Sequence, residues 1–127
     1  MPLHVQVDFQ REVIFVRGEG VVTDEDLIGY VEEYLGAEGL RDYDELFDLS
    51  AADLLDVTYA GLARVAECAA ATDPQVGPVK IALLVSEALG VGLSRMYQTL
   101  RESKGGRRHT RVFRNEAECR DWLGLPV

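Results

Sequence analysis

The segment from Val79 to Val85 constrains the fold more than any other part of the chain, because six of its seven residues are aliphatic. It is much too short to cross a bilayer, which takes roughly 20 apolar residues in a helix. A short aliphatic run of this kind is typical of a β-strand that is covered on both faces. We therefore predict that residues 79–85 form the central strand of a sheet.

Two more strands are predicted at the start of the chain. Between Leu3 and Phe9, apolar and polar residues alternate with a period of two, which indicates a half-buried edge strand. Residues 13–16 are apolar on both faces, as in a strand that is covered on both sides. A turn near Gln10 and Arg11 is expected to join the two strands into a hairpin.

Amphipathic helices alternate with the later strands. Thr23 is placed to cap a first helix, which Gly36 and Gly39 would end. Residues 45–49 and 110–113 are predicted as further strands. Three more helices are expected: one from Tyr59 that Asp73-Pro74 ends, one carrying Leu93, Met96, Tyr97 and Leu100 that Gly105-Gly106 ends, and a short one capped by Asn115 and carrying Trp122.

The resulting order of elements is ββαβαβαβα. Strands that are joined through helices pair in parallel by right-handed crossovers. We therefore predict an α/β fold with a single, mostly parallel mixed sheet and an antiparallel edge hairpin. A chain of 127 residues with 47% hydrophobic content is long enough to bury one sizeable core, so residues 1–127 are expected to form one domain.

Charge is distributed unevenly along the chain. The net charge of −9 argues against nucleic acid as a partner. Residues 1–56 carry fifteen acidic and three basic residues, whereas residues 95–120 carry eight basic and three acidic residues. Solvated helix faces that segregate by sign explain this pattern, and so does docking of opposite charges in a homodimer or on a protein partner.

The most basic stretch of the chain surrounds Gly105-Gly106. It could contact phosphate or an acidic partner. Alternatively, Arg101 and Lys104 offset the negative end of their own helix while the other three bases are solvated. The five basic residues are Arg101, Lys104, Arg107, Arg108 and Arg111.

No catalytic constellation, metal site or cofactor motif is recognised. His4 and His109 lie at opposite ends of the chain, and the carboxylates of the first half are expected at exposed helix and loop positions. Cys68 and Cys119 are expected to be buried free thiols. Polar residues interrupt the first twelve positions, so we predict no signal peptide, no membrane insertion and a cytoplasmic location.

Two groups of residues are candidate ligand contacts. Gly92, Ser94 and Arg95 lie near the start of the third helix, where main-chain amides could receive an anion, although we favour an ordinary strand-to-helix turn as the explanation of Gly90-Val91-Gly92. The second group could line a cavity between helices and sheet, or could simply be core residues: Tyr30, Tyr34 and Tyr97.

Two segments carry a resemblance to a known family. Phe47-Asp48-Leu49-Ser50 and Asp56-Val57-Thr58-Tyr59-Ala60-Gly61 are similar to the strand, loop and Asp-Ser-Ser-Gly-x-Gly helix start of STAS domains, which have the SpoIIAA-like fold. Residues 112–117, through Trp122-Leu123, more closely resemble an uncharacterised bacterial STAS/SEC14-like branch. The resemblance implies a regulatory or protein-binding module, and its SEC14 part implies a carrier or sensor of an apolar, amphipathic or anionic ligand.

In that family, the second serine of the motif is phosphorylated to switch partner binding. Thr58 occupies its position, and Asp56 and Gly61 match the flanking residues, whereas Val57 and Tyr59 depart from the motif. Thr58 is therefore a candidate phosphoacceptor. We favour the alternative that Thr58 is a plain helix cap, in which case an aspartate should be tolerated there. We predict a non-enzymatic module, with an apolar-ligand carrier and an unrecognised enzyme as the alternatives.

Overall fold

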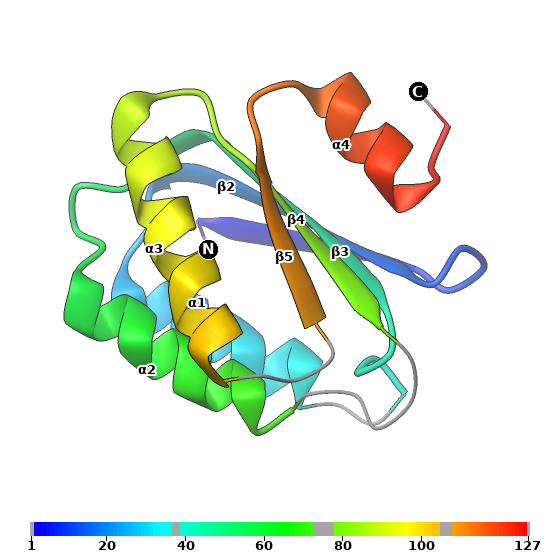
Figure 1. The fold of residues 1–127 in the computed structure, drawn as a ribbon, viewed down its shortest axis with the longest axis horizontal. Coiled ribbons are helices and arrows are strands. Elements are labelled where there is room, and N and C mark those ends of the chain that lie inside the picture. The colour runs from blue at the N-terminus through cyan, green and yellow to red at the C-terminus, as the bar shows by residue number, and fades with distance from the viewer. Residues whose placement is uncertain (1, 37–38, 73–77, 105–107, 127) are drawn as a thin grey trace.

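The order of elements follows the predicted pattern. The structure, a computed structural model, describes residues 2–36, 39–72, 78–104 and 108–126 (Figure 1). Its elements are β1 (Leu3–Asp8), β2 (Val13–Val21), α1 (Asp24–Tyr30), the π-helical turn η1 (Val31–Leu35), β3 (Asp44–Asp53), α2 (Tyr59–Ala70), β4 (Val79–Leu84), α3 (Ala88–Lys104), β5 (Arg108–Phe113) and α4 (Glu116–Leu123). The helix ends expected at Asp73-Pro74 and Gly105-Gly106 lie outside the described residues.

The predicted hairpin forms at the edge of the sheet. Oδ1 of Asp8 accepts hydrogen bonds from the amides of Gln10 and Arg11, at 3.1 and 2.9 Å, which fixes the turn. Glu12 then takes a positive φ of 57°, and β2 runs back antiparallel to β1. β2 is covered on both faces, because Val13, Ile14 and Val16 are all buried.

The sheet confirms the predicted mixed architecture. Its strand order is β1-β2-β3-β4-β5, and every pairing from β2 to β5 is parallel. The prediction that residues 79–85 form the central strand is wrong, because β3 is the middle strand and β4 lies between β3 and β5. The aliphatic run marked a strand that is buried on both faces. The true middle strand was less conspicuous because it carries Glu45 and Asp48.

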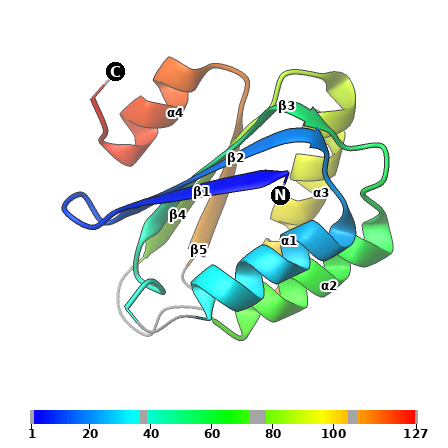
Figure 2. The same ribbon diagram turned by 180° about the vertical axis from the view of Figure 1, so that it is seen from behind.

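Helices cover the two faces of the sheet unequally. Figures 1 and 2 show α1, α2 and α3 on one face and α4 on the other. The larger core joins the first three helices to the sheet, and a smaller one packs Cys119, Leu123 and Leu125 against the opposite face. Cys119 is a buried free thiol, and burial raises its pKa to about 11, whereas the free thiol of Cys68 is only half-buried.

Replacing Leu83 by aspartate should unfold the protein. Leu83 is 7% exposed on β4, and a buried carboxylate without a partner costs several kcal/mol, which is on the order of the whole stability of such a domain. Thermal unfolding followed by circular dichroism measures the effect. Leu83→Met is the control, because it conserves volume and should cost less than about 1.5 kcal/mol. A native melting temperature for Leu83→Asp would contradict the assignment of β4 to the core.

Candidate functional site

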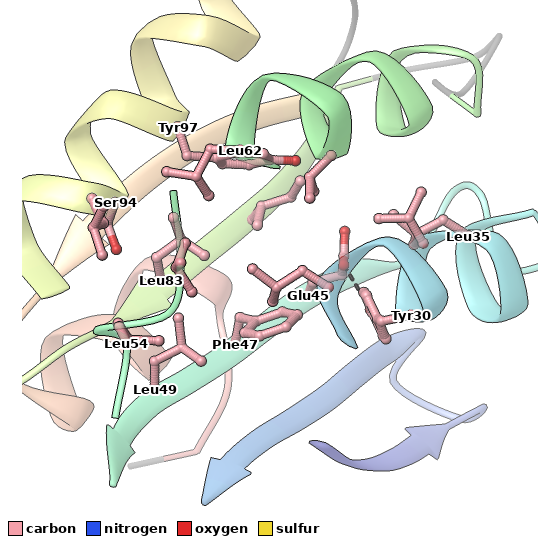
Figure 3. A pocket seen from close by; sticks show the side chains of 16 residues that line it. Tyr30, Leu35, Glu45, Phe47, Leu49, Leu54, Leu62, Leu83, Ser94 and Tyr97 are labelled. Atoms are coloured by element: carbon pink, nitrogen blue, oxygen red, sulfur yellow. Dashed lines mark hydrogen bonds between the residues drawn. The ribbon is translucent and has the colours of Figure 1, made fainter. Parts of the chain in front are cut away.

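A cavity of about 70 Å³ lies between the sheet and the helices on its more heavily covered face (Figure 3). Its wall is almost entirely aliphatic and aromatic, and it draws on α1, η1, α2, α3, β3 and β4. The lining residues are Leu27, Tyr30, Val31, Leu35, Glu45, Phe47, Leu49, Leu54, Val57, Leu62, Val65, Ile81, Leu83, Leu93, Ser94 and Tyr97.

One acidic side chain interrupts this apolar wall. Glu45, on β3, is only 2% exposed, and the Tyr30 hydroxyl donates a 2.7 Å hydrogen bond to its Oε1 (Figure 3). Its Oε2 is also buried and has no hydrogen-bond partner within residues 2–36, 39–72, 78–104 and 108–126. A buried polar atom without a partner costs roughly 1–3 kcal/mol, so a group that could pair with Oε2 would relieve this cost.

Burial controls the acid-base chemistry of the Glu45–Tyr30 pair. It raises the pKa of Glu45 above the ordinary value of 4.5, and this effect outweighs the nearby Arg108, the Tyr30 hydrogen bond and Arg101, which all favour the carboxylate. Burial also raises the pKa of Tyr30 well above 10, with Glu45 contributing in the same direction. Both shifts therefore favour the neutral form more than in the same groups exposed to water.

Two buried arginines lie near this pair. Arg101 and Arg108 are 2% and 5% exposed, so the expectation that Arg108 is solvated is wrong. Nη1 of Arg101 donates to the carbonyl oxygen of Ala66 at 3.3 Å, and Nη1 of Arg108 donates to that of Ala69 at 3.1 Å. Both carbonyls lie in the C-terminal half of α2, that of Ala69 in its last turn, so the guanidinium groups lie toward the negative end of α2. Arg101 was expected to offset the negative end of α3.

The expectation that the carboxylates of the first half are exposed is wrong for Glu45, which sequence reasoning missed as a site residue. The signal was present in the alternation of β3. Glu45 and Phe47 are two positions apart and so share a face of the strand. A charged residue that shares a face with a buried aromatic residue is itself a candidate for burial.

The predicted tyrosines and α3 residues divide between the cavity and its surroundings. Tyr30 and Tyr97 line the cavity, whereas Tyr34 stacks on the Tyr30 ring at a centroid distance of 5.5 Å and lies outside this wall. Of the predicted anion contacts, Ser94 is buried and lines the cavity. The structure does not bring it together with Gly92 and Arg95, which are both exposed.

Thr58 caps α2 through a double interaction. Its Oγ1 accepts a 2.9 Å hydrogen bond from the Gly61 amide and donates a 2.8 Å hydrogen bond to Oδ2 of Asp24. Oδ1 of Asp24 also accepts from the Thr58 amide at 3.0 Å. The close approach explains the glycine, because a Cβ at position 61 would collide with the Asp24 carboxylate. Asp56 lies exposed in the preceding loop.

The remaining sequence candidates do not gather into a second site. His4 and His109 lie exposed on β1 and β5, which are the opposite edges of the sheet. Among the residues that the structure describes, no group of three or more histidine, cysteine, aspartate or glutamate side chains could hold a metal ion. No helix in the same part of the chain is long and apolar enough to span a membrane.

Comparison with known proteins bears on the fold. No family model matches the sequence, and no curated protein matches it significantly. Among solved structures, the chain is similar to an uncharacterised protein of the DUF3478 family from Shewanella loihica PV-4, which has a SpoIIAA-like fold. The two share 14% sequence identity with a TM-score of 0.59, over 95% of this chain and 91% of the other.

The fold is SpoIIAA-like. The match confirms the fold that the STAS resemblance implied. At 14% identity it extends to the SpoIIAA-like architecture alone, so the chemistry of the cavity is argued from this chain's own residues.

Thr58→Ala should lower the free energy of unfolding by about 1 kcal/mol, because the α2 amide loses its cap. Thr58→Ser is the matched control and should retain stability, since a serine hydroxyl can make both bonds. The position of Asp24 reverses the expectation for Thr58→Asp, which would place two carboxylates together and should destabilise the protein. Urea unfolding measures all three variants. Equal stability of Thr58→Ala and the wild type would refute the capping role.

Glu45→Gln should change how stability depends on pH. Because the folded pKa of Glu45 is raised, its stabilising contribution is fully present below the ordinary pKa of 4.5 and is lost as pH rises through the folded value. Glutamine does not titrate, so the stability of Glu45→Gln relative to the wild type should increase as the pH rises above 4.5. Urea unfolding across this range, with the exposed Glu32→Gln as control, measures the difference. A constant difference would exclude a raised pKa for Glu45.

Proposed function

We propose that this protein is a non-enzymatic binding module whose cavity takes a small, largely apolar ligand. The observation that carries the proposal is the cavity itself, with an almost wholly apolar wall that contains the carboxyl of Glu45. Small-molecule sites in proteins combine this kind of lining with a few polar groups that orient the ligand. Carrier and sensor roles both need such a site.

The position of the cavity suits a sensor. Its wall includes residues from α1, α2 and α3 as well as from the sheet, so an occupant would contact all three helices together. A ligand that binds one arrangement of these helices better than another would shift the population toward it. The surfaces of the same helices would then report occupancy to a protein partner.

Phosphorylation of Thr58 is a weaker basis for a function. The hydroxyl that would accept the phosphate already bonds to Asp24 and to the Gly61 amide. A phosphate at this position would lie beside the Asp24 carboxylate and would meet repulsion there. Switching by phosphorylation of Thr58 therefore stays a prediction from the sequence. The homodimer and the cytoplasmic location are also predictions from the sequence.

Xenon should bind in the cavity of the intact protein. Xenon is an apolar probe that occupies cavities of this type. In methyl-detected NMR under xenon pressure, the methyl groups of Leu62, Val65 and Ile81 should shift in a saturable manner. The methyl groups of Leu123 and Leu125, in the smaller core on the opposite face, are the internal control and should not shift.

Native mass spectrometry of protein purified from its own host supplies the second measurement. A retained small molecule that is released on denaturation, and is displaced by xenon from the same cavity, would support the proposal. Uniform shifts in both cores, or no shifts at all together with no retained molecule, would refute it.

A further inference from the structure

The unpartnered oxygen of Glu45 identifies the polar group that an occupant of the cavity must bring. Glu45 lines the cavity, and Figure 3 shows its carboxyl projecting between the strands and the helices. Oε2 itself has almost no accessible surface, so neighbouring side chains must shift before an occupant can reach it. Oε1 of the same carboxyl is already bonded to the Tyr30 hydroxyl at 2.7 Å. A ligand that paired with Oε2 would therefore complete the hydrogen bonding of the whole group.

The charge near this oxygen disfavours an ionic ligand. A carboxylate would meet the Glu45 carboxyl, because neither Arg101 nor Arg108 is among the residues that line the cavity. The guanidinium groups of both arginines donate to main-chain carbonyl oxygens, including those of Ala66 and Ala69. An ammonium group would have to be desolvated and would approach the positive field of the two arginines, which already acts on Glu45.

A hydroxyl group can pair with Oε2 without bringing a charge into the cavity. It donates to Oε2 when Glu45 is ionised and accepts from it when Glu45 is protonated, because a hydroxyl is both donor and acceptor. The rest of the molecule must be apolar to match the wall of aliphatic and aromatic residues. The cavity, at about 70 Å³, is also well below the roughly 150 Å³ of an engineered cavity that holds benzene.

We propose that the cavity selects small neutral alcohols, with the ligand hydroxyl bonded to Oε2 of Glu45 and the hydrocarbon part lying against the apolar wall. This inference rests on the proposed ligand-binding function and names the chemical class of its ligand. Glu45 is the residue that sets specificity, and Tyr30 holds its carboxyl in position.

Four short-chain probes test the selection in the intact protein. 1-Propanol, n-butane and propylammonium each have four heavy atoms, and propionate adds an anionic head. Dissociation constants come from the same methyl NMR titration that xenon requires. The wild type should bind 1-propanol at least tenfold more tightly than propylammonium or propionate.

A double variant separates the hydrogen bond from general apolar affinity. Tyr30→Phe with Glu45→Leu replaces the buried polar pair by apolar side chains of similar size, which proteins often accept without loss of stability. Relative to the wild type, the preference for 1-propanol over n-butane should fall at least tenfold. Glu45→Gln is the matched control and should keep the preference, because an amide also bonds to a hydroxyl.

The outcomes distinguish the two proposals. If xenon and all four probes leave the lining methyl groups unshifted, the inference fails, and the ligand-binding function fails with it when no small molecule is retained either. If the probes bind but the preference for 1-propanol survives in the double variant, a bound water or another group satisfies Glu45, and only the inference fails. Tighter binding of propylammonium or propionate than of 1-propanol would also overturn it.

Discussion

Three ionisable side chains are buried on the helical side of the sheet, and the hydrogen bonds that offset their burial tie the elements together. Glu45 comes from β3, Arg101 from α3 and Arg108 from β5, and each is at most 5% exposed. Removing ions from water is tolerated only when nearby charges and hydrogen bonds offset the loss. Here the arginines bond to carbonyls in the C-terminal half of α2, and Glu45 bonds to Tyr30 of α1. The bond of Arg101 joins α3 to α2, and that of Arg108 joins β5 to α2. The bond of Glu45 joins β3 to α1.

Periodicity predicted the fold well because every element carries its own local signal. The alternation in β1, the apolar stripes of the helices and the caps at Thr23, Thr58 and Asn115 all depend on neighbouring residues. The middle strand was misassigned because aliphatic content reports burial and not position in the sheet. The burial of Arg108 was missed because its hydrogen-bond acceptors, in Ala69, Thr72 and Arg41, lie 36 or more positions away in the sequence.

The candidate site could be predicted only in part from the sequence, because several of its contacts join segments that are distant in the chain. Tyr30 and Tyr97 could be proposed as cavity residues from their positions on amphipathic helices, and both line the cavity. Glu45 acquires its chemistry from contacts with distant segments, so composition alone placed it with the exposed acids. Thr58 shows both situations at once: its bond to the Gly61 amide is local and was expected, but its bond to Asp24 spans 34 positions and changes what a substitution there would do.

The agreement between strand order in the sheet and strand order in the chain has a consequence for folding kinetics. Because β1 to β5 are neighbours in both, no strand has to wait for a later segment to be inserted beside it. Each pairing closes only the loop formed by one hairpin or one helical crossover, so the entropy lost at each step is that of a short loop. Folding rates of small proteins rise as the mean sequence separation of contacts falls. The sheet can therefore grow outward from the hairpin one unit at a time, in the order in which the ribosome releases the chain.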